Sequence, residues 1–96
     1  MRIIARGTLR VFWAANPDGD QPLKSWFREA EAADWETPHD VKDQYGTASV
    51  IGDSRIVFNI AGNKYRLVSV IKYRWQIVYI RHILTHAEYD KGRWKL

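Results

Sequence analysis

Side chains that can transfer protons or bind phosphate are concentrated at the end of the chain, in the segment YIRHILTHAEYDKGRWKL. His86 is the strongest candidate for proton transfer, because an ordinary histidine titrates near neutral pH and this one is expected to begin a helical turn among cations. Tyr89 follows on the same side of that turn, where it could stack on a base or exchange a proton. A surface histidine in a capping turn and a tyrosine that anchors the turn to a sheet are the structural alternatives.

A further candidate is Arg66 in the run KYRLV. Its planar guanidinium could hold a phosphate through two donors and stabilise charge that develops on the phosphate oxygens. The structural alternative is a cross-strand ion pair, although few acidic residues are near. Strand alternation places Arg66 on one face with Lys64, and it places Arg81 and a half-buried His82 on opposite faces of the last strand. A groove lined by strand cations and closed by the final turn would suit a polyanion.

Charge is distributed unevenly along the 96 residues, whose net charge is +4. Residues 1–53 hold six Lys and Arg against nine Asp and Glu, a net charge of −3, whereas residues 54–96 hold nine against two, a net charge of +7. A basic half indicates a phosphate-rich partner such as nucleic acid. The alternative is a solvated strand face that carries ordinary surface cations.

The composition excludes several classes of site. Cysteine is absent, so the chain has neither a disulfide nor a thiolate zinc site. The histidines match no metal-ligand spacing, and the sequence has no serine–histidine–acid set or glycine-rich phosphate loop, so we expect neither a metal nor another cofactor. With no signal peptide and no run of about 20 apolar residues, we expect a cytoplasmic protein without a membrane partner, made of one domain over residues 1–96.

The first half of the chain has helical periodicity. A short strand is expected at MRII, and RGTLRVFWAAN then predicts a helix that ends in the stop signal NPDGD. The segment QPLKSWFREAEAADW predicts a second helix, with Pro22 in its first turn and an apolar stripe that includes Leu23 and Trp26. Thr37 is a suitable N-cap for a third, short helix that runs through Tyr45.

The second half changes to strand periodicity. SRIVFNI, KYRLVSVIKY and IVYIRHIL predict three strands, joined by tight turns at AGN and RWQ. Thr85 followed by Glu88 is a capping-box pattern, so a helical turn should begin there. Together these signals predict an α+β fold in which N-terminal helices pack on one face of a small antiparallel β-sheet and leave its other face uncovered.

Two stretches carry a specific resemblance to a known family. FNIAGNKYRLV and IRHILTHAEYDK resemble signatures of the HigB toxins of bacterial toxin–antitoxin pairs, a branch of the RelE-like messenger-RNA interferases. MRIIARGTLRVFW and LKSWFREAEAADW are also similar to that family, so the resemblance covers nearly the whole chain. It implies a RelE-like fold.

The resemblance also implies an activity and partners. The activity is that of a type II toxin, an endoribonuclease that cuts messenger RNA, typically on the ribosome. The partners are messenger RNA, the ribosome and a cognate helix-turn-helix antitoxin of the HigA type. The toxin would contact operator DNA only through this antitoxin. In such enzymes the RNA 2′-hydroxyl is the nucleophile, so no metal is required: one group accepts its proton, a second protonates the leaving 5′-oxygen, and cations stabilise the phosphorane.

Motif positions imply a catalytic set of Arg66, His86 and Tyr89. Arg66 matches a phosphate-binding arginine of the wider family, whereas His86 and Tyr89 fall in a segment where RelE carries an arginine and a functional tyrosine. His86 therefore replaces a cation that cannot titrate, and the early-strand lysine pair of RelE relatives has no full counterpart here. The RNA-binding residues that we expect are Arg55, Asn63, Lys64, Arg81 and Lys91.

Two other functions are compatible with the same residues. A non-catalytic RNA- or ribosome-binding module of this fold would keep the basic groove and would not need His86. A protein-interaction domain would instead use its basic surface to bind an acidic partner helix. A short helix-turn-helix gene beside this one in the genome would favour the toxin over both.

Overall fold

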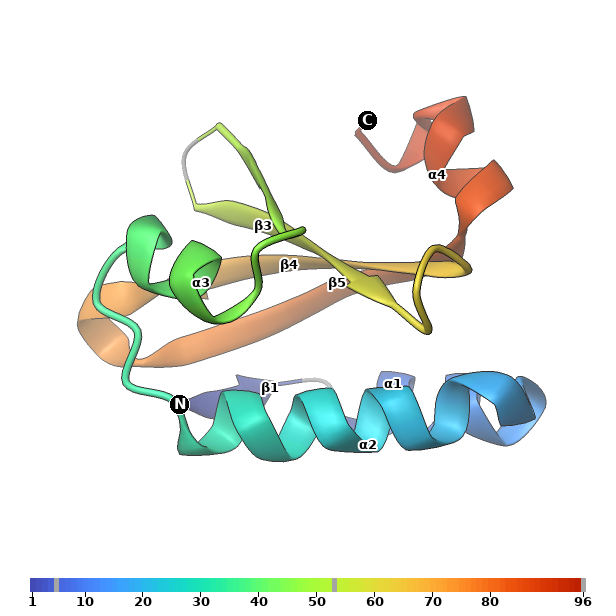
Figure 1. The fold of residues 1–96 in the computed structure, drawn as a ribbon, viewed down its shortest axis with the longest axis horizontal. Helices are drawn as coiled ribbons and strands as arrows, with labels where there is room; N and C mark the ends of the chain where they lie inside the picture. Colours follow the sequence, from blue (N-terminus) through green and yellow to red (C-terminus); the bar gives the residue numbers. More distant parts are fainter. Residues whose placement is uncertain (5, 53, 96) are drawn as a thin grey trace.

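The computed structural model describes residues 1–4, 6–52 and 54–95, in which helices pack on a five-stranded mixed sheet (Figure 1). The strand order is β1-β5-β4-β3-β2, with β1 parallel to β5 and the other pairings antiparallel. In chain order the elements are β1 (Arg2–Ile4), α1 (Arg6–Ala15), α2 (Pro17–Ala32), α3 (Pro38–Gln44), β2 (Ser49–Ile51), β3 (Arg55–Ile60), β4 (Tyr65–Lys72), β5 (Ile77–Thr85) and α4 (His86–Lys91), with 3-10 turns at Tyr73–Trp75 and Arg93–Lys95. The expected α+β fold with N-terminal helices is confirmed.

The junction between the first two helices differs from the prediction. NPDGD does not form a loop, because only Asn16 separates α1 from α2, which begins at Pro17. The Asn16 side-chain amide donates to the Phe12 carbonyl at 3.0 Å and closes the end of α1. Proline is favoured at a first helical position, and the Asp18 carboxylate next to it compensates the helix dipole. Helix α2 therefore begins at this proline, and Pro22 lies one turn further in than expected.

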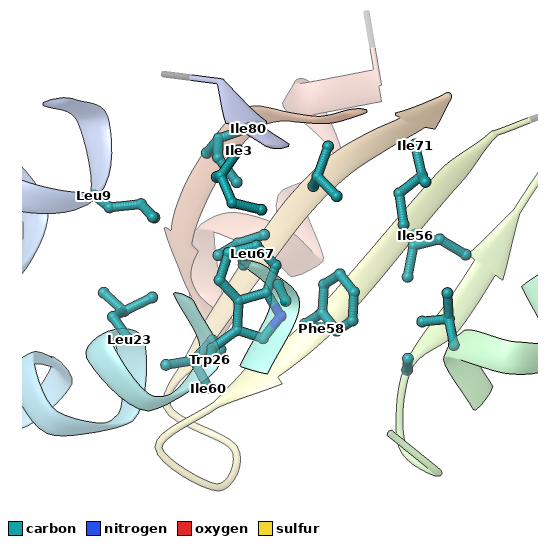
Figure 2. Close-up of a cluster of buried hydrophobic side chains, with 14 of the residues drawn as sticks. Ile3, Leu9, Leu23, Trp26, Ile56, Phe58, Ile60, Leu67, Ile71 and Ile80 are labelled. Atoms are coloured by element: carbon teal, nitrogen blue, oxygen red, sulfur yellow. The ribbon is translucent and has the colours of Figure 1, made fainter. Parts of the chain in front are cut away.

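Helix α2 directs the predicted apolar stripe at the sheet. Leu23 and Trp26 are buried, and the Trp26 ring meets the Phe58 ring of β3 edge to face, with 5.2 Å between centroids. Figure 2 shows these side chains in one cluster with Leu67 of β4 and with isoleucines from four strands. Because each large apolar side chain contributes about 1.5–3 kcal/mol on burial, this cluster fixes the helices on one face of the sheet.

Strands β3, β4 and β5 form the predicted antiparallel meander, and two further pairings extend it. β2 pairs with β3, and β1 pairs with the far edge of β5, where Arg2 is aligned with Ile77. The SVI segment of β2 is too short to show an alternating pattern. The parallel pairing joins the two ends of the chain, so no local periodicity could indicate it.

A β-bulge changes the direction of side chains in β5. Val68 of β4 is opposite His82 and Ser69 is opposite Ile80, so Arg81 is an extra residue without a partner on β4. In a bulge two residues oppose one, and the alternation of faces is broken locally. The prediction that Arg81 and His82 lie on opposite faces is therefore wrong: both line the same hollow, and His82 is exposed rather than half-buried.

The prediction that one sheet face is uncovered is also wrong in part. Figure 1 shows α4 and the C-terminal end on the side of the sheet opposite α1 and α2. Gly92, with a φ of +74°, turns the chain back after α4, and Trp94 is buried against Val57 and Val68. A positive φ costs glycine no steric strain, which permits this turn. Within the described residues, no helix combines the length and apolarity needed to cross a bilayer.

Candidate active site

Arg66 is an unusual feature of β4, because this cation is only 8% exposed. Its Nη1 donates to the Asn63 carbonyl at 3.2 Å and to the Tyr65 carbonyl at 3.3 Å, and its Nη2 donates to the Asn63 side-chain oxygen at 2.9 Å. Among the described residues, no carboxylate lies within 4.0 Å of it. The guanidinium is thus held in one orientation by neutral oxygens, and its charge is left uncompensated, with donors to spare for an anion.

Two aromatic rings stack beside Arg66. The guanidinium carbon lies 5.6 Å from the centroid of the Tyr89 ring, and that ring is stacked on Trp94 at 4.9 Å, with 14° between the planes. The Trp94 indole donates to the Tyr89 carbonyl at 2.9 Å, which links the turn after α4 to the helix itself. Tyr89 and Arg66, far apart in the sequence, are therefore in cation–π contact.

The capping box fixes the start of α4. The Thr85 hydroxyl accepts a hydrogen bond from the Glu88 N–H at 3.2 Å, and the Glu88 carboxylate accepts one from the Thr85 N–H at 2.9 Å. The hydrogen bond from the Thr85 backbone holds the pKa of Glu88 below its usual value. The His86 N–H donates to the Lys64 carbonyl at 2.9 Å, so α4 begins directly beside the residue that precedes β4. The predicted cap is confirmed.

His86 lies at the first helical position and pairs with a carboxylate one turn later. Its Nδ1 is 3.0 Å from Oδ2 of Asp90, and its side chain is 44% exposed. A carboxylate at Nδ1 orients the ring and favours the tautomer with the proton on that nitrogen. Nε2 is then the atom available to accept a proton from a bound molecule, and it can return the proton later in a reaction.

Two adjoining hollows lie on what we call the basic face, the sheet face that carries Arg55, Arg66, Arg81 and His82. The first has a volume of about 220 Å³ and is lined by Arg55, Val68, Val70, Arg81, His82 and Trp94. The second has a volume of about 350 Å³ and is lined by His82, Leu84, Glu88, Lys91, Arg93 and Trp94. His82 and Trp94 border both, so the two hollows form one continuous depression with four cations around it.

The predicted RNA-binding residues divide into three groups. Arg55, Arg81 and Lys91 line the depression. Asn63 instead contacts Arg66 through both its carbonyl and its side chain. Lys64 lies against the first turn of α2, where its ammonium contacts the Asp18 carboxylate at 2.7 Å.

The contact of Lys64 belongs to a small polar cluster on the helix side of the sheet. The Tyr65 hydroxyl donates to Oδ1 of Asp18 at 2.6 Å, while Lys64 contacts Oδ2. The hydrogen bond from Lys64, followed by that from Tyr65, lowers the pKa of Asp18 below its usual value. The same bond raises the pKa of Lys64. The cluster holds the turn before β4 on the helix layer, and the Lys64 charge is already compensated.

The residues of the depression that sequence reasoning did not assign to RNA binding include His82, Arg93 and Trp94. His82 was misplaced because the bulge at Arg81 has no local signature. The segment GRWKL did contain a signal, since a glycine before a tryptophan at the end of a helix is typical of a chain that turns back to bury the ring. Within the described residues, no three His, Cys, Asp or Glu side chains are grouped so that they could hold a metal ion.

Comparisons with known proteins add a family assignment. The sequence model of the HigB toxin family, described as the RelE-like toxic component of a toxin-antitoxin system, matches residues 19–92. The mRNA interferase toxin HigB of Escherichia coli strain K12 is 45% identical over 38 residues, which are 40% of this chain and 36% of the relative. The mRNA interferase HigB of E. coli O6:H1 is 25% identical over 93 residues, or 95% of this chain and 90% of the relative. The chain thus aligns with about a third of the K12 protein and with nearly all of the other.

Proposed function

The chain belongs to the HigB family of RelE-like toxins, and from this premise we propose that it is a metal-independent ribonuclease that cuts messenger RNA. The observation that carries the proposal is the state of Arg66: a nearly buried cation held by neutral oxygens, with no carboxylate in contact among the described residues. A buried charge is costly unless a partner compensates it. A phosphate of bound RNA supplies that partner.

The reaction that we propose is intramolecular attack within the RNA. The 2′-hydroxyl oxygen forms a bond to the adjacent phosphorus, its proton passes to a base on the protein, and the bond from phosphorus to the 5′-oxygen breaks. A proton delivered to that oxygen completes the step and leaves a 2′,3′-cyclic phosphate and a free 5′-hydroxyl. The nucleophile belongs to the substrate, so the protein supplies only proton transfer and charge stabilisation.

Three residues are assigned to this step. His86 transfers a proton through Nε2, since its Nδ1 is engaged by Asp90. Arg66 stabilises the charge that develops on the non-bridging phosphate oxygens, and the Tyr89 ring, in cation–π contact with the guanidinium, helps to position it. Preorganised donors of this kind avoid reorganisation during the reaction, which is the usual source of such stabilisation.

The depression on the basic face binds the RNA that flanks the cut. Arg55, Arg81, Lys91 and Arg93 contact phosphates, and the hollow between them accommodates a base beside His82. We place this reaction on the ribosome in the cytoplasm. A helix-turn-helix antitoxin of the HigA type is the proposed partner, and operator DNA is contacted only through it.

The test is expression of the unmodified chain in cells without an antitoxin. We expect growth arrest and discrete messenger-RNA cuts, mapped by primer extension, with 5′-hydroxyl ends at the downstream fragments. His86→Ala and Arg66→Ala should each relieve the arrest while the circular-dichroism spectrum and melting temperature show a folded protein. A non-catalytic RNA-binding module would behave differently, because loss of His86 would leave its effect unchanged and no cuts would appear.

A further inference from the structure

A groove of about 230 Å³ lies between α1 and α2, away from the residues assigned to the reaction. Its lining residues are Arg6, Arg10 and Trp13 from α1 and Lys24, Phe27 and Arg28 from α2. The helices that form it pack on one side of the sheet, whereas Trp94 and Tyr89 cover the other side. The groove and the basic face are therefore separate surfaces of the molecule.

Most of the positively charged side chains in the acidic first half of the chain line this groove. Residues 1–53 have a net charge of −3 and contain six Lys and Arg, yet four of these six line this one groove. Among the described residues, the only carboxylate within ion-pair distance of the four is Asp20, which contacts Lys24 at 2.8 Å. None of the other three cations has a carboxylate within ion-pair distance in the described part of the chain, so the rim of the groove attracts an anionic partner.

The floor of the groove is apolar. Trp13 and Phe27 are half-buried, and each has a cation over its ring: Lys24 lies 5.5 Å from the Trp13 centroid, and Arg6 lies 5.0 Å from the Phe27 centroid. Elsewhere on α1, outside the groove lining, Val11 is 73% accessible. An apolar floor with a charged rim is the usual design of a surface that binds another protein.

The arrangement of the rings argues against RNA at this groove. Proteins that bind single-stranded RNA stack bases on the free faces of aromatic rings. Here a cation of the chain itself already lies over each ring. An aliphatic side chain needs only the gap between the rings, and carboxylates on either side of it can pair with the cations of the rim.

We propose that the α1–α2 groove docks an acidic amphipathic segment of a partner protein, which inserts one apolar side chain between Trp13 and Phe27. Its Asp and Glu side chains meet Arg6, Arg10 and Arg28. The inference rests on the proposed function in one respect, the identification of this partner as the antitoxin. A segment bound here leaves Arg66 accessible, so the groove anchors the partner and any blockage of the basic face requires another part of it.

A peptide-binding experiment on the full chain tests the groove directly. The probe is a fluorescein-labelled peptide of 16 residues, with Glu on its polar face and Leu on its apolar face, followed by fluorescence anisotropy at low salt. Arg10→Glu with Arg28→Glu should weaken binding of this peptide about tenfold or more, since each rim charge is reversed. The matched control, Arg55→Glu with Arg81→Glu on the basic face, should leave peptide binding unchanged. Melting temperatures of both double variants verify that they are folded.

Three results would overturn the inference. The first is no binding of the peptide at concentrations up to about 1 mM, and the second is an equal loss of peptide binding in the two double variants. The third is binding of a labelled single-stranded oligoribonucleotide that depends on Arg10 and Arg28 rather than on Arg55 and Arg81. The last result would make the groove a nucleic-acid site. Failure of the proposed function is seen separately, as absence of growth arrest and of cuts by the unmodified chain, and it leaves the peptide measurement interpretable.

Discussion

Arg66 and Asn63 form a single unit at the start of β4: the guanidinium donates to the Asn63 side-chain oxygen at 2.9 Å and to its carbonyl at 3.2 Å. Asn63→Ala removes the first of these bonds and keeps the arginine. We expect kcat/KM for RNA cleavage to fall about 10- to 100-fold, the usual cost of a misplaced group. Arg66→Ala should cost about 10²–10³-fold through lost charge stabilisation. Single-turnover cleavage of a defined RNA measures both.

Two further variants distinguish orientation from charge at Arg66. Arg66→Lys keeps the charge without the planar fork, so it should recover only part of the activity. Asn63→Asp preserves shape but gives the guanidinium an internal counter-ion, and it should be less active than Asn63→Ala. An Asn63→Ala protein as active as the unmodified chain would mean that the bond to Asn63 has no part in positioning Arg66.

Thr85→Ala separates the stability of α4 from its chemistry. The substitution removes the hydroxyl that accepts the Glu88 N–H, so the free energy of unfolding should fall by about 0.5–2 kcal/mol, as measured by urea denaturation. Cleavage should fall less than in His86→Ala, because a single proton-transfer group contributes about 10²–10⁴-fold. The opposite order, with both proteins folded, would make His86 a structural residue.

The salt dependence of RNA binding should distinguish Arg81 from Lys64, although the sequence predicts both to bind RNA. If three or four phosphates are contacted, the slope of log K against log salt should be about −2 to −3, at roughly −0.7 per contact on a single strand. Arg81→Gln should reduce the magnitude of this slope by about 0.7. Lys64→Gln should change it less, because the Lys64 ammonium contacts Asp18 at 2.7 Å. Equal changes in the two variants, or affinity that is flat with salt, would contradict the proposed RNA surface.

Chelation tests the proposed mechanism. Cleavage of naked RNA by an excess of purified protein should be the same with and without EDTA, since the nucleophile comes from the RNA and proton transfer from His86. The cuts are first established without chelator. In a parallel assay with ribosomes, the ribosomes are kept intact by other means. Loss of these cuts in EDTA with recovery on addition of a divalent ion would exclude the 2′-hydroxyl mechanism in this form.

Asp18 should make the free energy of unfolding decrease at acidic pH. Lys64, then Tyr65, hold the pKa of this carboxyl below its usual value in the folded state. The folded protein therefore binds a proton at Asp18 more weakly than the unfolded chain does, and its contribution to stability, present above the usual carboxyl range, is lost as the pH falls through it. Asp18→Asn should flatten the decline in unfolding free energy below about pH 5. Asp43→Asn, which affects an exposed contact with His39 at 3.5 Å, is the control and should change the profile less.

Much of the architecture was predictable because its signals are local. The capping box of Thr85 depends on a residue three positions away, and the alternation of β3, β4 and β5 depends on next-but-one neighbours. The stripe of α2 with Leu23 and Trp26 has the helical period for the same reason. The family signatures are likewise contiguous stretches, and the match over residues 19–92 agrees with them.

The geometry of the site depended on contacts that no local pattern encodes. The ion pair of Lys64 is with Asp18, which is 46 residues away in the sequence. The bulge that brings Arg81 and His82 to one hollow depends on how β5 aligns with β4 rather than on either residue alone. Trp94 reaches the sheet only because the chain turns back after α4 and buries the ring against Val57 and Val68. Residue types determined which chemistry the chain can supply, whereas long-range packing determined which of those residues face the same space.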